Sequence, residues 1–580
     1  MGEKIIAVVG ARLNSSRLPK KHFLPLAGKP LIERLWERLT KVRCISKIIL
    51  ATTDDDYNIP LQDWAREHGH GFLAYDGDIN DLMGRVDTVV KQYDADIVLY
   101  VCGDCPLIEP ATIDRMFEQI LSDPKIETVA LKAAEGRPKN IHEGFDVYRR
   151  GFWDRMMAVA EAPFEREHVG AVYHHLKKVT PTTVAYVTEP AIYSSVEHRI
   201  SVDTPSDYRF MKRLYSDWYS ENTSETLVDL SSVITKLHNE PALSLINKHV
   251  YQKNIFDKSI KVALITEAGP QVGLGHLMRM LVTAAALQDY LGAKVTLFIK
   301  GQVIEDPELA LIPHEWLVEF DEGVLQQVAV DNHVCVFDVK DVSLLSSPIK
   351  AMQQTKALLV GVDIAVQNAS LFDVVWMPTF YDTWSKLGLS NLHGGWDCYL
   401  LRDSANWHPH HDRAHKRILI LTGGSDAGGL GEKLPDMLLK NLPDGTYIDW
   451  VQGPYAPAPL IPTVNDGCFN VIVAPDNLPN IYAEYDAILC VYGVSFFECL
   501  RAGVPTVVFD AIGAAGTAEW QALVQQFPNT TADCIDTAIS MLGNMLRQEG
   551  VSESMVDVSR KLRKGPKQFA MTVMQCLEEA

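Results

Sequence analysis

Small, hydroxyl and cationic side chains gather directly after the first apolar run of the chain. Residues 5–9 are apolar and form a run short enough for a buried parallel strand. The residues that follow and suit contact with a phosphate are Ala11, Arg12, Ser15, Ser16, Arg17 and Lys21. Small residues let backbone N–H groups approach a phosphate, hydroxyls donate to it, and cations neutralise it. The pattern predicts a triphosphate-binding loop without Walker spacing, and a solvated basic loop is the alternative.

A lone carboxylate follows another apolar run. Residues 95–102 are mostly apolar, and Asp104 stands just beyond them, between Gly103 and Pro106. Magnesium in proteins is commonly held by one or two carboxylates together with substrate phosphates. We therefore expect Asp104 to lie over the edge of the sheet as a Mg²⁺ ligand. The alternative is an aspartate that only forms the turn before a proline.

A histidine marks a second candidate site. Gly273 and Gly275 free the backbone just before an expected amphipathic helix, where N–H groups point toward an anion or a substrate oxygen. His276 at that position is suited to act as a base near neutral pH. A structural histidine is the alternative.

Strands that alternate with helices must position these residues. Apolar runs at 5–9, 47–53, 95–102, 260–266, 418–421 and 487–491 alternate with helical periodicity. This alternation predicts α/β units with parallel, doubly wound sheets. We expect a first domain over 1–215, a helical linker over 216–258, and two Rossmann-like lobes over 259–405 and 416–580 with a cleft between them.

Composition limits the partners of the chain. Its 580 residues carry 54 Lys and Arg against 74 Asp and Glu, a net charge of −20. Such a charge argues against nucleic acid or an anionic membrane as a partner. We find neither an apolar run of membrane-spanning length nor a secretory leader, and the ten cysteines are scattered. These features predict a cytoplasmic protein.

The first loop belongs to a longer pattern. The letters ARLNSSRLPKK at 11–21 and AGKPLI at 27–32 resemble the signature of the sugar-activating cytidylyltransferases, which include acylneuraminate and 3-deoxy-octulosonate enzymes. The resemblance implies CTP and an acidic sugar as substrates and Mg²⁺ as cofactor, with Arg17 and Lys21 on the phosphates. The string GDCPLI at 103–108 resembles the metal motif of the family, and Asp203 matches its second metal ligand.

Other blocks resemble the family in the same order. The segment 78–86 resembles a nucleotide-pocket segment, which implies that Asp81 contacts base or ribose and that Arg85 faces phosphate. Asp81 is equally suited to cap a helix. Glu167 and His168 fall in a block that implies contact with the acceptor sugar.

The C-terminal half resembles a different family. The letters GLGHLMRM at 273–280 resemble the motif of the UDP-sugar hydrolase of the pseudaminic acid pathway, which has a glycosyltransferase-B-like fold. That resemblance implies His276 as the base that activates water and Gly275, Arg279 and Asp338 as substrate contacts. Gly-rich turns suggest nucleotide contacts at Gly424, Ser425, Ser495 and Glu498.

Several positions depart from the hydrolases and leave the second activity open. Glu267 stands where they carry aspartate, Val339 and Lys340 replace a His-Tyr pair, and residues 518–521 read AEWQ. We predict a bifunctional enzyme that makes a CMP-sugar and hydrolyses a UDP-sugar. A glycosyltransferase or a non-catalytic nucleotide-sugar module in the second half remains open, as does a homodimer.

Overall fold

The chain divides into two compact units, Met1–Lys258 and Ser259–Ala580. The computed structural model describes residues 3–137, 139–252, 256–269, 272–382, 388–410, 415–426, 428–462, 467–473, 475, 477–511, 513–547 and 553–579.

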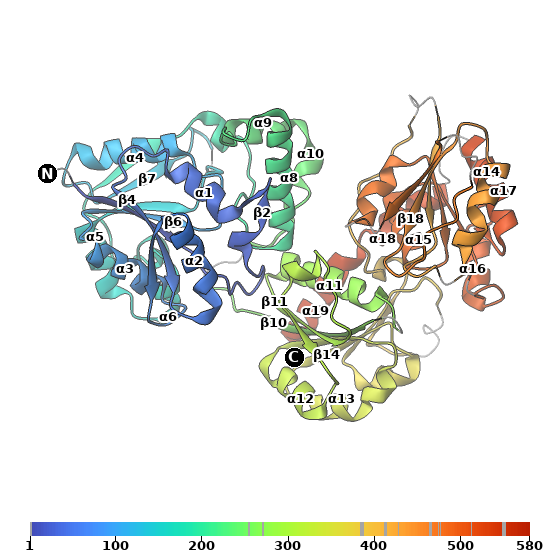
Figure 1. Ribbon diagram of the computed structural model, residues 1–580. Helices are drawn as coiled ribbons and strands as arrows, with labels where there is room; N and C mark the ends of the chain where they lie inside the picture. Colours follow the sequence, from blue (N-terminus) through green and yellow to red (C-terminus); the bar gives the residue numbers. More distant parts are fainter. Residues whose placement is uncertain are drawn as a thin grey trace. The chain divides into compact units, whose positions relative to one another are not determined.

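The first unit is built on a seven-stranded sheet (Figure 1). In spatial order its strands are β5 (Gly71–Tyr75), β4 (Lys47–Thr53), β1 (Ile5–Gly10), β6 (Ile97–Cys102), β8 (Phe145–Arg149), β7 (Thr128–Lys132) and β9 (Val184–Thr188). The first four are parallel, as expected, but β8 runs antiparallel to both β6 and β7. The sheet is therefore mixed, which corrects the expectation of a parallel sheet; strand direction depends on the packing of distant segments.

Helices cover both faces of this sheet. The longer ones are α1 (Leu31–Leu39), α2 (Ile59–Glu67), α3 (Leu82–Gln92), α4 (Pro110–Ser122), α5 (Arg150–Val159), α8 (Pro205–Glu221) and α9 (Leu230–Asn239). Three short helices are α6 (Pro163–Glu167), α7 (Ala171–His174) and α10 (Pro241–Ser244). Separate apolar clusters form on the two faces, which explains why the strands read as nearly continuous apolar runs.

The segment 216–258 differs from the spacer that the sequence suggests. Helix α8 continues through residue 215 to Glu221, so the expected boundary lies inside a helix. Leu230 and Ile234 of α9 are fully buried, and the Arg38 guanidinium donates to the carbonyl of Val228 at 2.7 Å. These contacts make the segment an integral part of the first unit.

The second unit contains two parallel sheets. The first sheet has the order β12 (His314–Leu317), β11 (Lys294–Gly301), β10 (Lys261–Ala268), β13 (Val334–Asp338), β14 (Leu358–Val362), β15 (Val374–Met377) and β16 (Leu392–Gly394). The second has the order β19 (Phe469–Val473), β18 (Tyr447–Gln452), β17 (Arg417–Leu421), β20 (Ala487–Val491), β21 (Thr506–Phe509) and β22 (Thr531–Ala532). Neighbouring strands are parallel in both sheets, which confirms the expected Rossmann-like lobes.

Helices connect the strands of each lobe or follow its last strand. In the first lobe they are α11 (Gly275–Leu291), α12 (Glu322–Asp331) and α13 (Ser346–Met352). In the second they are α14 (Leu434–Asn441), α15 (Val494–Ala502), α16 (Ala518–Gln526), α17 (Ile535–Arg547) and α18 (Glu553–Leu562).

The C-terminal helix returns to the first lobe. Helix α19 (Gly565–Glu579) packs on α11, and Phe569 and Val573 belong to the apolar core of the first lobe. The Phe569 ring meets Trp376 edge to face at 5.2 Å. The expected second lobe over 416–580 therefore loses its last helix to the first lobe. Sequence periodicity identifies a helix but not the lobe against which it packs.

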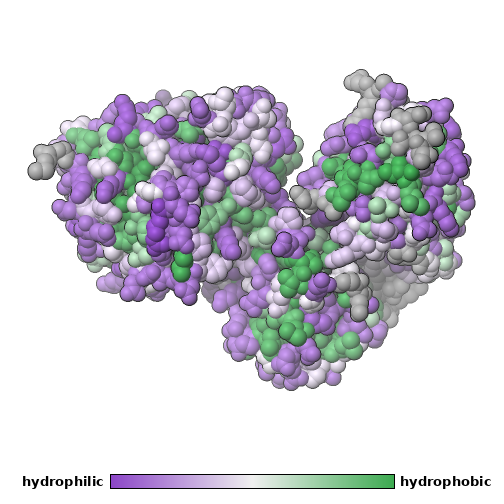
Figure 2. All heavy atoms as spheres, in the orientation of Figure 1, coloured by the Kyte–Doolittle hydropathy of each residue, from purple (hydrophilic) through white to green (hydrophobic). Residues whose placement is uncertain are grey.

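The surface drawn in Figure 2 is mixed in polarity. Apolar residues form small green patches among polar ones in each unit on this face. Within the described residues, no helix combines the length and apolar character required to cross a bilayer.

Candidate active sites

In each sheet the chain adds strands first on one side of its first central strand and then on the other side. In the first unit β1 leads to β4 and β5 on one side, and the chain then returns to place β6 on the other. The same change occurs between β10 and β13 and between β17 and β20. Ligands of open α/β sheets bind beyond the carboxyl ends of the strands at such points. All three predicted sites begin at one of them.

The first of these points brings two loops into close contact. Strands β1 and β6 end at the same level, where Gly10 is paired with Cys102. Just beyond this pair, the Gly103 N–H donates to the Gly10 carbonyl at 3.0 Å. A Cβ added at Gly103 would lie 2.7 Å from that carbonyl oxygen. Glycine is therefore required where the two loops cross, and this crossing sets Asp104 beside the loop 11–21.

The loop 11–21 is held by its own polar contacts. Ala11 is buried and its N–H donates to the carbonyl of Ala51 at 3.2 Å. The Ser15 hydroxyl accepts from the N–H of Leu18 at 3.3 Å, and Ser16 is exposed. Arg12 donates to the Ile79 carbonyl at 3.0 Å, which ties the loop to segment 78–85. These contacts shape the loop around the side chains that face Asp104.

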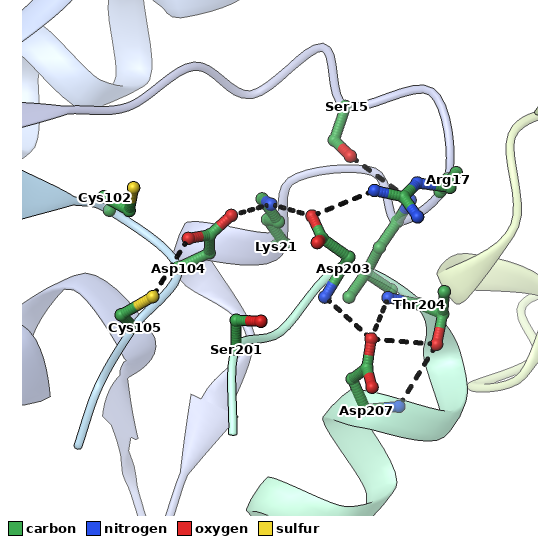
Figure 3. Close-up of polar contacts among 12 residues, drawn as sticks. Ser15, Arg17, Lys21, Cys102, Asp104, Cys105, Ser201, Asp203, Thr204 and Asp207 are labelled. Carbon is green, nitrogen blue, oxygen red and sulfur yellow. Dashed lines mark hydrogen bonds and ion pairs between the residues drawn. The ribbon is translucent and has the colours of Figure 1, made fainter. Parts of the chain in front are cut away.

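Four residues from distant parts of the chain converge there (Figure 3). The Lys21 ammonium lies 2.5 Å from Asp104 Oδ2 and 2.8 Å from Asp203 Oδ1. The Arg17 guanidinium lies 3.3 Å from the same oxygen of Asp203. The structure thus brings together the two carboxylates and the two cations that the sequence places at one site.

Helix α8 fixes the position of Asp203. Thr204 caps the helix, and the Asp207 carboxylate accepts from the backbone N–H groups of Asp203 and Thr204 at 3.1 and 3.0 Å. The reciprocal capping box satisfies N–H groups that would otherwise lack partners. It confirms the expected Thr204 cap and orients Asp203 toward Lys21.

Arg199 is a member of the site that the sequence does not single out. Its guanidinium donates to Asp203 and lies 3.2 Å from Asp207 Oδ2. Burial alone would lower the pKa of Lys21, but Asp104 and Asp203 hold it well above its usual range. Burial would likewise raise the pKa of Asp203, but Lys21, Arg17 and Arg199 hold it well below. Lys21 and Asp203 are therefore held in their charged forms by each other and by the neighbouring charges.

His22 packs against the loop that contains Gly103. It is buried and its Nδ1 lies 3.1 Å from the Gly103 carbonyl oxygen. Burial, and next the Lys21 ammonium, lower the pKa of His22 from 6.5 to about 4. His22 is therefore neutral at pH 7 and contributes a packed ring beneath the crossing of the two loops.

We expect His22 to make the stability of the first unit depend on pH. Its pKa is lower in the folded state, so the unfolded state binds more protons between pH 6.5 and about 4. The stability that the neutral His22 contributes is fully present above pH 6.5. The free energy of unfolding then falls by up to about 3 kcal/mol as the pH is lowered through about 4. Hydrogen exchange of the β1 amides across this range should show the loss, and His22→Gln should flatten it. Identical profiles for the two proteins would contradict the assignment.

The structure shows Asp81 and Arg85 in contact with protein groups. Asp81 caps α3 by accepting from the Gly84 N–H at 2.7 Å and forms an ion pair with Arg166 at 2.6 Å. Its carboxylate is thus already committed to protein groups. Arg85 is buried and donates to the Ile79 carbonyl at 2.9 Å, and burial lowers its pKa to about 10. Both residues therefore stabilise segment 78–85, and their contacts with a nucleotide stay a prediction.

The two residues expected at the acceptor sugar lie near the loop through Arg12. Glu167 ends α6 and its carboxylate lies 3.8 Å from the Arg12 guanidinium. His168 follows it and is exposed. The structure places Glu167 beside the loop 11–21, and the contacts described for both residues do not include Asp104 or Asp203.

The second unit carries a histidine–aspartate pair between β10 and β13. His276 stands in the first turn of α11, and its Nδ1 lies 2.6 Å from Asp338 Oδ1 at the end of β13. Gly275 is the first residue of the helix. The carboxylate partner selects the tautomer with the proton on Nδ1, which leaves Nε2 free to accept a proton.

Arg279 completes this group one helical turn further on. It donates to both oxygens of the fully buried Asp338 at 2.6 and 2.7 Å and pairs with Asp363 at 2.8 Å. Burial would raise the pKa of Asp338, but Arg279 lowers it. Asp338 is therefore an anion that holds both His276 and Arg279, as expected for a base and its positioning carboxylate.

Between β17 and β20, backbone groups of the loop after β17 lie at the same sheet edge as the start of α15. Gly424 and Ser425 are exposed beyond β17, and the Gly424 carbonyl accepts from the Tyr455 N–H at 2.9 Å. Ser495 lies in the first turn of α15, which follows β20. Because β17 and β20 are paired, these residues share one edge of the sheet, where a helix N-terminus favours an anion.

The structure corrects the expected role of Glu498. Only 2% of its surface is exposed, and Arg402 donates to its two oxygens at 2.8 and 3.0 Å. The Tyr482 hydroxyl adds a third contact at 3.3 Å. A carboxylate so fully occupied is not free to hold ribose hydroxyls. Its partner stands 96 residues earlier, which sequence spacing does not reveal.

We expect Arg402→Met to destabilise the second unit by about 3 kcal/mol, because it leaves the Glu498 carboxylate buried without a partner. Arg402→Met combined with Glu498→Gln should recover most of that loss. Urea unfolding of the second unit measures both effects. A single variant as stable as the wild type would show that this pair contributes little.

These features define an α/β chain with a nucleotidyltransferase-like first unit and a two-lobed, glycosyltransferase-B-like second unit. The first unit has a mixed sheet, and the second has two parallel sheets with α19 packed on the first of them. Residues 6–262 match the family model described as Cytidylyltransferase, and the N-terminal half is cytidylyltransferase-like.

Similar proteins divide between the two halves. A protein from Methanocaldococcus jannaschii is 27% identical over 43% of this chain and 97% of its own length. A 3-deoxy-manno-octulosonate cytidylyltransferase from Trichlorobacter lovleyi is 34% identical over 24% of this chain, which spans 53% of that relative. The structure of a putative UDP-N-acetylglucosamine 2-epimerase from Listeria monocytogenes aligns with 56% of this chain and with 98% of its own length. The sequence identity is 15% and the TM-score is 0.38.

Proposed function

We propose that the first unit transfers CMP from CTP to an acidic sugar of the nonulosonic or octulosonic type and releases pyrophosphate. The observation that carries this proposal is the convergence of Arg17, Lys21, Asp104 and Asp203 at the point between β1 and β6. The match to the cytidylyltransferase family over residues 6–262 supports the choice of CTP. The named octulosonate relatives support an acidic sugar.

The residues of the site have separable roles in this reaction. A sugar hydroxyl attacks the α-phosphate of CTP, and pyrophosphate leaves. Arg17 and Lys21 neutralise the phosphates of CTP. Backbone N–H groups of the loop 11–21 and the Ser15 hydroxyl position these phosphates. Arg199 and the capping box of α8 hold Asp203 in place.

The pair Asp104 and Asp203 suits a divalent cation. Their oxygens already share one positive group, the Lys21 ammonium, at 2.5 and 2.8 Å. Two carboxylates, with phosphates supplying further oxygens, are a donor set that Mg²⁺ accepts. We therefore propose Mg²⁺ as the cofactor, held by these residues, where it would neutralise the triphosphate and stabilise the leaving group.

The reaction can be tested by measuring pyrophosphate release. The full chain with Mg²⁺ is supplied with CTP, UTP, ATP or GTP and with a panel of nonulosonic acids, octulosonates and neutral hexoses. We expect release only with CTP and an acidic sugar. Equal release with a neutral hexose, or with any triphosphate, would contradict the substrate assignment.

We propose further that the second unit hydrolyses a UDP-sugar, so that the chain is bifunctional in the synthesis of surface or flagellar glycans. His276 would activate water through Nε2, with Asp338 as its positioning carboxylate. Gly424, Ser425 and Ser495 would contact the diphosphate. The cytoplasm, where nucleoside triphosphates are made, is the compartment that we propose.

The occupied Glu498 carboxylate favours a second candidate for this unit, a module that binds a nucleotide sugar without cleaving it. A glycosyltransferase is the third. UDP-sugars supplied without an acceptor separate the three, because only a hydrolase should release UDP in quantity. Release that requires an added sugar acceptor would identify a transferase, and tight binding without release would identify the binding module.

A further inference from the structure

The Lys21 ammonium occupies the point that Asp104 and Asp203 share (Figure 3). It lies 2.5 Å from one carboxylate and 2.8 Å from the other. Only 10% of its side chain is exposed, against 21% and 23% for the two carboxylates. The two carboxylates are therefore partly exposed, and the ammonium that contacts both of them is more deeply buried.

The charges of this cluster leave no excess of negative charge for an added cation. Among the described residues, Lys21, Arg17 and Arg199 carry three formal positive charges, and Asp104, Asp203 and Asp207, the last paired with Arg199, carry three formal negative charges. The cluster is therefore formally neutral before a metal joins it. A divalent cation that joined this cluster without the departure of a cation would meet repulsion as well as attraction.

Lys21 is the cation best suited to leave. Arg199 is held by Asp207 from behind as well as by Asp203 and is 11% exposed. A guanidinium makes several fixed contacts, whereas an ammonium is a compact charge on a flexible stem of four carbons. Lys21 also begins the short helix Lys21–Phe23, directly after Lys20 in a left-handed backbone conformation, so that its stem starts at a turn.

We propose that Lys21 is an internal substitute for the metal: it holds Asp104 and Asp203 together until a divalent cation binds, and it then moves to the phosphates of the nucleotide. This inference rests on the proposed function for the identity of the cation and the nucleotide. It makes metal binding the event that releases a positive charge to the triphosphate. The binding of metal without nucleotide is correspondingly weak, because the metal must first displace the ammonium.

The test is a calorimetric titration of the nucleotide-free full chain with Mn²⁺. Lys21→Met keeps most of the side-chain volume and removes the competing charge, so we expect its Mn²⁺ affinity to be about tenfold higher than that of the wild type. Lys20→Met is the matched control: it removes the same charge from an exposed neighbour, and its affinity should equal that of the wild type. A Lys21→Met variant that binds Mn²⁺ no more tightly than the wild type overturns the proposal.

A second measurement does not depend on the folding of the variant. A crystal structure of the wild type with Mn²⁺ and without nucleotide should show the Lys21 ammonium beyond hydrogen-bond distance of at least one carboxylate. An ammonium that still contacts both carboxylates beside the bound ion overturns the proposal. Pyrophosphate release is measured in parallel. If wild-type release depends on CTP and an acidic sugar while Lys21 stays in place, only the displacement fails; if release is absent, the proposed function fails.

Discussion

Replacement of Asp104 by alanine is expected to reduce pyrophosphate release from CTP and an acidic sugar by at least about a hundredfold. The reason is electrostatic, because charge that develops on the transferring phosphate must be neutralised at fixed positions. Asp104 is one of two carboxylates that converge on Lys21, and no other described carboxylate lies within 4 Å of that ammonium besides Asp203. A coupled assay for pyrophosphate under saturating substrates measures the change.

Asp63→Ala is the matched control for this prediction. Asp63 is an exposed aspartate of α2 whose only described ion pair is with Arg66 on the same helix. Its loss should leave turnover within about twofold of the wild type, as for most surface substitutions. Wild-type turnover by Asp104→Ala would remove that residue from the reaction.

Replacement of His276 by alanine is expected to reduce UDP release by the second unit by about a hundred- to ten-thousandfold, the usual contribution of a positioned general base. His276 Nδ1 contacts the Asp338 carboxylate, so Nε2 is the ring nitrogen that would activate a substrate water in this proposal. The affinity for the UDP-sugar should change little, because the diphosphate contacts are proposed on the other lobe. Single-turnover release and equilibrium binding, measured on the same preparation, separate the two effects.

His314→Ala supplies the control for this substitution. His314 is an exposed histidine of β12 in the same lobe, and its Nδ1 faces the carbonyl of Ile312 at 2.9 Å. We expect the control to release UDP at the wild-type rate. Unchanged release by His276→Ala would exclude this histidine as the base, and loss of binding would indicate that it contacts the sugar nucleotide directly.

The sequence predicts the parts of the fold that local patterns determine. The strands β4 and β20 begin and end where their apolar runs do, and Thr204 caps α8 as its position before Pro205 suggests. The antiparallel direction of β8 and the return of α19 to the first lobe were not predictable in this way. Both depend on which distant surface an element covers, which periodicity does not encode.

The same distinction between local patterns and distant contacts applies to the residues of the candidate sites. Lys21 and Asp104 lie in short, ordered strings, so their types and spacing were sufficient to place them at one loop crossing. Asp81 and Glu498 were assigned to ligands because their partners, Arg166 and Arg402, stand far away in the sequence. Arg199 was missed as a member of the first site because a mostly buried arginine in the loop before α8 has no distinctive spacing. A buried carboxylate needs a partner, but sequence alone does not name it.

A crystal structure of the full chain with CTP and Mn²⁺ tests the central claim most directly. We predict the anomalous signal of the metal between Asp104 and Asp203, and the triphosphate along the loop 11–21 with Arg17 on its phosphates. A nucleotide bound elsewhere in the first unit, or a metal that contacts neither aspartate, would contradict the account.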